Sequence, residues 1–179
     1  MKPNRLFILA AIVMLFTASC TNPRTKQLDL IAEKEQSIFG DTIFWVSHER
    51  AHDLVAAYIA FSDKFPTDTL APEMIFRAAD ISMNTGSPQA AVEMFTRIID
   101  DYPEFRKVPE IYFLMAFAYD NHLRDFDNAR RYYKEFISRF PEHELADDAG
   151  LLIHHLGKSP DELIKEFEAL RQQESGITN

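Results

Sequence analysis

The stretches YIAFSDKFP at 58–66, FTRIIDDYP at 95–103 and YKEFISRFP at 133–141 share one pattern. Each begins with an aromatic residue, has a second apolar residue three positions later, and ends with an aromatic residue followed by proline. The three prolines are 37 and 38 residues apart. A self-similar period of about 20–50 residues indicates a repeat array. The chain is therefore predicted to consist of repeated units.

The residues before each proline have the spacing of one helix face. Apolar residues stand twelve, eight and five positions before the proline, and this spacing of four and three puts them on one side of an α-helix. They are Leu54, Tyr58, Phe61, Ala91, Phe95, Ile98, Ala129, Tyr133 and Phe136. After the first two prolines, Pro72 and Pro109 suit the first turn of a new helix, and Ala79 and Ala116 would let two helices approach closely.

Candidate capping residues mark the helix ends. Ser87 and Ser159 are predicted N-caps followed by proline, and Glu162 would complete a capping box with Ser159. No segment alternates apolar and polar residues over a strand's length, so no sheet is expected. The predicted helices span 24–38, 47–65, 71–84, 88–102, 108–122, 126–139, 144–156 and 160–173. An irregular helical bundle is the alternative, but a bundle has no reason to repeat its loops.

A small residue, an alanine, an aromatic residue and a proline recur in this order. They are Ala79, Ala91, Phe95 and Pro103, and then Ala116, Ala129, Tyr133 and Pro141. This pattern resembles the tetratricopeptide repeat, a helix–turn–helix unit of about 34 residues. Over roughly residues 47–170, the resemblance implies an all-α, right-handed superhelix of antiparallel helix pairs with about three to four repeats. The longer period is assigned to longer loops between units.

The beginning of the chain has the pattern of a secretory signal peptide. Lys2 and Arg5 precede an apolar run at 6–16, and small residues at 17–19 lead to Cys20, the single cysteine. The run is shorter than the about 20 residues that span a bilayer. The position of Cys20 resembles a bacterial lipoprotein cleavage box, which implies that Cys20 is acylated and anchors the protein. A cleaved signal with a chance cysteine is the alternative.

Four segments follow from these patterns. We expect a lipoprotein signal peptide at 1–19, a polar tether at 20–27, a helical repeat domain at 28–173 and a frayed tail at 174–179. The residue after the cysteine is threonine instead of aspartate, which resembles sorting to the outer membrane. The expected location is the outer membrane, lipid-anchored on the periplasmic side, with the choice between periplasmic and surface leaflets left open.

The charge balance limits the class of ligand. The chain has 19 basic and 28 acidic residues and a net charge of −9, and loss of Lys2 and Arg5 with the signal would make it −11. Nucleic acids and anionic membrane surfaces need basic patches, so neither is an expected ligand. Basic or neutral protein segments are the expected partners.

One motif suggests chemistry. Residues 48–52, HERAH, match the zinc-peptidase pattern H-E-x-x-H, in which His48 and His52 would bind zinc and Glu49 would act as general base. A third ligand is missing from the following residues. The competing interpretation is that Ser47 caps a helix and the histidines lie in solvent. We therefore expect no metal, no cofactor and no catalytic residue, with a zinc metallopeptidase as the alternative function.

His154 raises a different question, because it stands at the small-residue position of its unit. We expect it to be a partly buried packing residue and not a metal ligand.

The family resemblance also implies a partner-binding groove lined by the first helix of each unit. The corresponding positions are Glu73, Phe76, Asp80 and Met83 in one unit, Glu110, Phe113, Phe117 and Asp120 in the next, and Asp148, Leu151 and His155 in the last. Acidic and apolar residues together suit a basic or amphipathic partner segment. Alternatively, Phe76 and Phe113 pack between units.

The lipoprotein pattern and the repeats together resemble envelope lipoproteins of the BamD type and the repeat domain of YbgF-type proteins, in a small protein of the Bacteroidota kind. This implies a lipid-anchored scaffold or adaptor that binds protein partners, in the setting of outer-membrane protein assembly. Besides the metallopeptidase alternative, binding of a small ligand or a glycan stays open.

Overall fold

The computed structural model describes residues 22–39 and 47–176, and these residues are all-α, without a strand. The elements are α2 (Pro23–Phe39), α3 (His48–Lys64), α4 (Ala71–Asn84), α5 (Pro88–Asp101), α6 (Val108–Phe117), the π-helical turn η1 (Ala118–Leu123), α7 (Phe126–Arg139), α8 (Ala146–His155) and α9 (Pro160–Gly176). The all-α prediction is confirmed. Cys20 and the predicted signal peptide lie outside the described residues.

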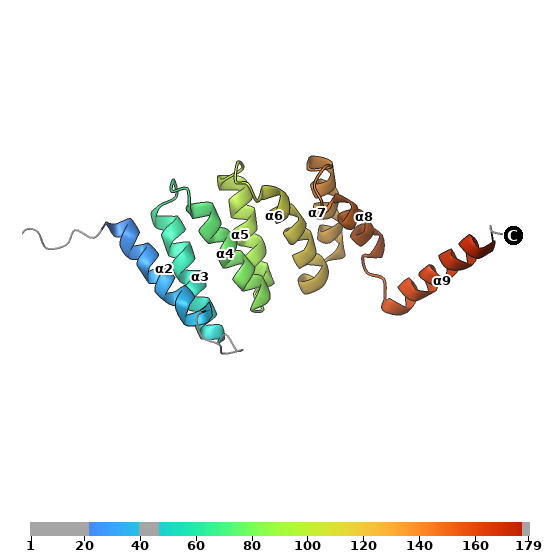
Figure 1. The fold of residues 1–179 in the computed structure, drawn as a ribbon, viewed down its shortest axis with the longest axis horizontal. Helices are drawn as coiled ribbons and strands as arrows, with labels where there is room; N and C mark the ends of the chain where they lie inside the picture. Colours follow the sequence, from blue (N-terminus) through green and yellow to red (C-terminus); the bar gives the residue numbers. More distant parts are fainter. Residues whose placement is uncertain (1–21, 40–46, 177–179) are drawn as a thin grey trace, which may run out of the picture.

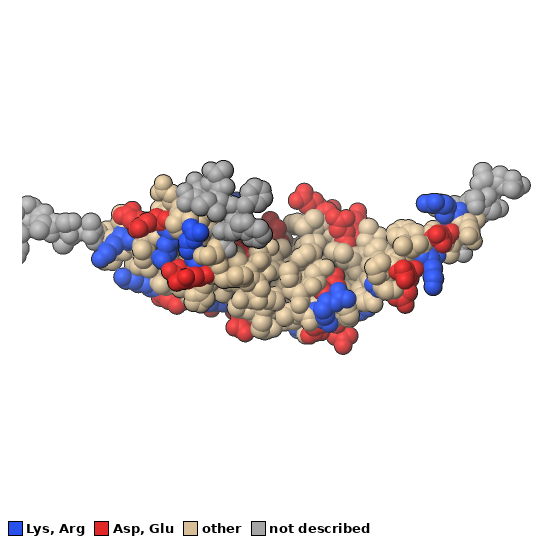
Figure 2. All heavy atoms as spheres, turned by 90° about the horizontal axis from the view of Figure 1, so that it is seen from below, with Lys and Arg blue, Asp and Glu red and all other residues tan. Residues whose placement is uncertain are grey.

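The helices form a row in chain order (Figure 1). Helix α3 packs against α2 and α4, α4 packs against α5, and α7 packs against both α6 and α8. Helix α9 extends away from the end of this row. The molecule is elongated and curved, and both ends bend toward the same side (Figure 2). This arrangement is a superhelical array of antiparallel helix pairs, as the repeats predict.

The aromatic residues before the repeated prolines all end helices in the same way. Their φ and ψ angles are −129° and 59° at Phe65, −135° and 56° at Tyr102, and −130° and 58° at Phe140. Proline disfavours the helical conformation in the residue before it, so each helix stops there. The backbone N–H three residues later donates to each carbonyl, from Asp68, Phe105 and His143 respectively. The loops between units are therefore true structural repeats.

The apolar stripe predicted from the proline offsets forms the core. All nine of its residues are at most 1% exposed. Ala79 and Ala116 are completely buried as well, because they lie where two helices of a unit approach each other. The free energy of burial along this stripe, about 25 cal/mol per Å² of apolar surface, stabilises one helix pair against the next.

The one-residue difference between the two periods has a structural cause. The spacing from Ala79 to the N-cap Ser87 is eight residues, but the spacing from Ala116 to the N-cap Asp125 is nine. The extra residue falls where η1 replaces an α-helical turn, since a π-helical turn accommodates one more residue than an α-helix. The second unit is therefore the first unit with a one-residue insertion in its first helix.

The N-terminal boundary of the folded part lies earlier than residue 28. Helix α2 begins at Pro23, within the segment expected to be a tether, and Arg24 forms a bidentate ion pair with Asp68 in the loop before α4. At the other end, α9 continues to Gly176. The capping box of α9 is present, with Ser159 and Glu162 bonded to each other's backbone N–H groups.

None of the helices in the described part of the chain is long and apolar enough to cross a bilayer.

Candidate partner-binding site

Glu73 is the centre of a charge cluster at the start of α4. Its carboxylate lies 3.0 Å from Lys107 Nζ and 3.5 Å from Arg77 Nε, with Arg106 at 3.9 Å. Burial alone would raise the pKa of Glu73, but the hydrogen bond and charge of Lys107, aided by Arg77, lower it overall. Glu73 is therefore neutralised within the fold and offers little negative charge to a partner.

A small hollow brings the predicted first-unit residues together. Glu73, Phe76 and Asp80 line it, with Phe39 of α2 and Lys107 of the next loop, and its volume is about 200 Å³. Lys107 Nζ lies 4.1 Å above the ring centroid of Phe76, within cation–π range. The sequence did not indicate Lys107, because this residue reaches the site from a loop 34 residues away from Glu73.

Phe76 and Phe113 pack mostly between helices and face the groove only in part. The ring centroid of Phe76 lies 5.9 Å from that of Phe95 and 6.5 Å from that of Phe105. Phe113 lies 5.6 Å from Tyr133 and 5.7 Å from Phe136. Both are only partly buried, so each fills the space between helices and leaves one edge at the surface.

Met83 is not a groove residue. Its side chain is 6% exposed and packs in the core with α5, so this part of the predicted groove is wrong. The reason is the position of Met83 one turn beyond Ala79, where α4 still faces its partner helix. The corresponding Asp120 of the second unit is only partly buried, because η1 changes the direction of the residues after Ala116.

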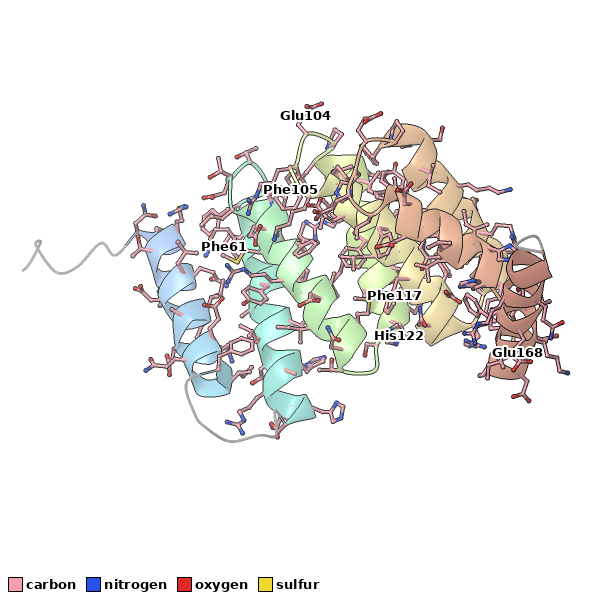
Figure 3. All side chains as sticks on the ribbon, turned by 45° about the vertical axis from the view of Figure 1, so that its right-hand side comes forward. Phe61, Glu104, Phe105, Phe117, His122 and Glu168 are labelled. Carbon is pink, nitrogen blue, oxygen red and sulfur yellow. The ribbon has the colours of Figure 1, made fainter. Side chains whose placement is uncertain are left out.

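The second unit presents the uncompensated acidic residues. No ion pair joins Glu110 or Asp120 to another described residue, and one carboxylate oxygen of Glu110 is buried without a hydrogen-bond partner there. Burial raises the pKa of Asp120, partly opposed by the charge of Arg124. Phe117 lies beside His122 (Figure 3), with ring centroids 5.9 Å apart. This unit combines a partly exposed aromatic side chain with free carboxylates.

The third-unit residues lie apart from these. Leu151 is 59% exposed, and the ring of His155 contacts Phe167 of α9 at 6.3 Å between centroids. Asp148 lies exposed in the first turn of α8. None of these three residues lines the first-unit hollow.

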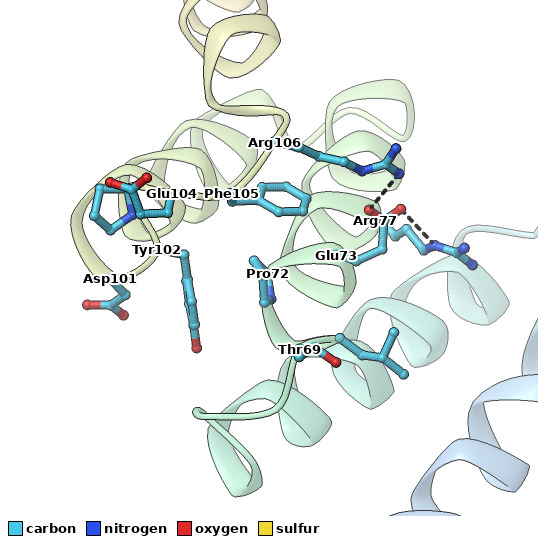
Figure 4. Close-up of a pocket in the computed structure, with 11 residues that line it drawn as sticks. Thr69, Pro72, Glu73, Arg77, Asp101, Tyr102, Glu104, Phe105 and Arg106 are labelled. Atoms are coloured by element: carbon cyan, nitrogen blue, oxygen red, sulfur yellow. Dashed lines mark hydrogen bonds and ion pairs between the residues drawn. The ribbon is translucent and has the colours of Figure 1, made fainter.

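Two cavities at the loop edge of the array were not predicted. The larger, about 770 Å³, lies between the loops before α4 and α6 and is lined by Pro72, Tyr102, Phe105 and Arg106 (Figure 4). A second, of about 430 Å³, lies one unit further along and shares Phe105 and Arg106. The signal in the sequence was the repeated aromatic–proline pair: Tyr102 and Pro103 line the larger cavity, and Pro103 and Phe140 line the second.

The H-E-x-x-H residues lie in the first turns of α3. His48, Glu49 and His52 are exposed, and Ser47 accepts a hydrogen bond from the backbone N–H of Arg50, as expected for an N-cap. In the part of the chain that the structure describes, no three histidine, cysteine or acidic residues are grouped as metal ligands. No third ligand therefore joins the two histidines there.

The packing role expected for His154 is wrong. Its side chain is 59% exposed, and Nε2 lies 2.6 Å from Glu166 of α9. Lys158 Nζ lies 2.7 Å from the same carboxylate. These two contacts, with Lys158 the stronger influence, lower the pKa of Glu166 to about 2 and hold α9 at an angle to α8.

Comparison with known proteins supports the class of fold. Residues 73–104 and 110–143 each match the tetratricopeptide repeat, and these ranges correspond to the α4–α5 and α6–α7 pairs. No curated protein and no solved structure matches the chain. The two central units therefore match the tetratricopeptide repeat, a unit that generally mediates contacts between proteins. The molecule is thus a helical-repeat protein with the architecture of a protein-binding scaffold.

Proposed function

We propose that this protein is a lipid-anchored scaffold of the cell envelope, facing the periplasm, that binds basic or amphipathic segments of protein partners. The binding face that we propose comprises Asp80 of α4 and Glu110, Phe117 and Asp120 of the second unit. The observation that carries the proposal is the partly exposed Phe117 in a unit whose Glu110 and Asp120 have no ion pair with other described residues. Such a face suits an apolar side chain flanked by lysine or arginine.

The contacts in the first unit show which acidic residues remain to attract a basic segment. Since Lys107 and Arg77 neutralise Glu73, the attraction for a basic segment comes from Asp80 and from the second unit. Asp80 and Phe117 occupy equivalent positions, one residue after Ala79 and Ala116. The repeat therefore places an acidic and an aromatic residue one unit apart on the same side. A π-helical turn in the same unit fits this assignment, since such turns are frequent at functional sites.

The location of the protein in the cell envelope is proposed from the sequence. The run before Cys20 and the polar residue after it support acylation and outer-membrane sorting, and the likeness to BamD-type lipoproteins makes outer-membrane protein assembly the process to test first. Incorporation of labelled fatty acid should be detected in the wild type and lost in Cys20→Ala. Absence of label from the wild type would remove the anchor from the proposal.

The binding face is tested once crosslinking in envelopes has identified a partner. We expect Phe117→Ala to weaken binding by about 1–3 kcal/mol, the range of an interface hot spot, without loss of helical structure. Asp80→Lys with Asp120→Lys should slow association, most strongly at low salt. The matched control is Glu93→Lys, an exposed charge reversal on α5. If only Glu93→Lys impairs binding, the proposed face is wrong.

A further inference from the structure

Helix α9 carries the same apolar stripe as the second helix of each complete unit, but its stripe is uncovered. Counted from the N-caps Ser87, Asp125 and Ser159, the eighth residue is Phe95, Tyr133 or Phe167. Phe95 and Tyr133 are completely buried, whereas Phe167 is 59% exposed. Ile164 is 55% exposed; its equivalent is the buried Val92 in α5 and the exposed Arg130 in α7. A helix with the sequence of a packed element thus lacks its packing surface.

The cause lies in α8. The positions of α4 and α6 that hold the second helix of the unit are Ile75 and Ala79, and Tyr112 and Ala116, all buried. The equivalent positions of α8, nine and thirteen residues after Pro141, are Gly150 and His154, both exposed.

Glycine offers no apolar side chain, and histidine places a polar ring where alanine allows close approach. Therefore α8 cannot hold α9 as α4 holds α5.

Contacts between α9 and the end of α8 direct α9 outward. Glu166 bonds to His154 and Lys158 on one side of α9. Helix α9 runs away from the array (Figure 1), and its residues Ile164 and Phe167 are exposed. The stripe is therefore presented to another molecule instead of to the chain's own α8.

We propose that the occupant is a second copy of this chain, whose α9 packs antiparallel against the first through Ile164 and Phe167. One pair of opposite charges favours this arrangement of two helices that each carry more acidic than basic residues. Asp161 and Arg171 are ten residues apart, about 15 Å along a helix, on either side of Phe167. Asp161, Ile164, Glu168 and Arg171 are spaced by three, four and three residues, so they share one flank.

In an antiparallel pair related by a two-fold axis level with Glu166, midway between Asp161 and Arg171, this flank faces the same flank of the other copy. Arg171 of each copy then lies next to Asp161 of the other. Neither residue has an ion pair with any other described residue. Glu168, seen on α9 in Figure 3, lies on the same flank, so the pairing depends on Arg171 to offset the acidic groups.

The size of the contact predicts a weak dimer. A 17-residue helix is about 25 Å long, and two such helices bury less surface than the about 1,200–2,000 Å² of a standard stable interface. Association should therefore depend on concentration.

Site-specific photo-crosslinking of the full chain, expressed in cells, tests the proposal. With p-benzoylphenylalanine in place of Ile164, we expect an adduct of two chains whose cross-linked peptides both come from α9. The same probe in place of Ala169, an exposed residue on the side of α9 opposite Ile164 and Phe167, should give at least about tenfold less of this adduct. No adduct, or adducts only with other proteins, would overturn the proposal.

Charge reversal provides a second test, which uses the same photo-crosslinking experiment. Asp161→Arg or Arg171→Asp alone should lower the adduct yield at least about fivefold, and the double exchange should restore it. Circular dichroism verifies that the variants keep their helices, as expected for residues outside the core. Equal yields in the singles and the double variant would overturn the antiparallel arrangement.

Discussion

Two buried tyrosines at equivalent repeat positions should respond in opposite ways to the same substitution. Tyr58 and Tyr133 stand eight residues before Pro66 and Pro141, and both are at most 1% exposed. The Tyr58 hydroxyl donates a 2.6 Å hydrogen bond to Glu35, whereas the Tyr133 hydroxyl has no partner among the described residues. We predict that Tyr58→Phe destabilises the protein and that Tyr133→Phe stabilises it.

The magnitudes follow from the two environments. A hydrogen bond to a charged group contributes about 1.5–3 kcal/mol. Arg77 continues to bond Glu35 at 2.9 Å, so the loss in Tyr58→Phe should lie near the lower end, about 1.5 kcal/mol. A buried hydroxyl without a partner costs about 1–3 kcal/mol, so Tyr133→Phe should gain about 1 kcal/mol.

Urea unfolding followed by far-ultraviolet circular dichroism measures both changes, and a thermal shift of roughly 2–4 °C per kcal/mol is expected for a chain of this size. Tyr132→Phe is the control. This tyrosine is partly buried, stacks on Tyr119 and has no hydroxyl bond within the described residues, so its change should be near zero. Destabilisation by Tyr133→Phe, or changes of equal sign at Tyr58 and Tyr133, would refute the reasoning.

Two further predictions concern charge. Because the pKa of Glu73 is lowered in the folded state, its ion pairs stabilise the protein above the ordinary glutamate pKa of about 4.3 and lose this effect as the pH falls through the lowered value. The difference in unfolding free energy between wild type and Glu73→Gln should therefore shrink from pH 7 to pH 3, and a constant difference would contradict this. Deleting Asn121 should convert η1 to an α-helical turn and force Asp120 toward the buried position held by Met83 in the first unit. We expect a loss of about 2 kcal/mol or more in urea unfolding, recovered by adding Asp120→Met; equal stability of the deletion and wild type would disprove it.

Much of the fold could be predicted because prolines and caps are local signals. Helices α4, α5 and α7 begin and end within one residue of the predicted bounds. The stripe from Leu54 to Phe136 is buried as its spacing requires. The π-helical turn was visible only as a one-residue difference between Pro66–Pro103 and Pro103–Pro141, which does not reveal where the extra residue goes.

The site was harder to predict because its charges meet across units. Nothing near Glu73 in the sequence indicates Lys107, which reaches it from the next loop. His154 was recognised at the small-residue position, yet its consequence was missed. A ring in place of alanine prevents helix packing there and turns α9 outward, so the histidine lies in solvent.

The shared geometry of the loops after α3, α5 and α7 affects how such a protein can change its length. Since each unit ends with the same backbone angles, each next unit starts in the same direction. A second copy of the segment from Ala71 to Lys107, inserted before Val108, would end with the existing Lys107–Val108 junction and begin at Lys107, which stands 37 residues after Leu70 in the equivalent loop position. Gene duplication could thus lengthen the array in whole units, with curvature per unit unchanged and no new connection to evolve.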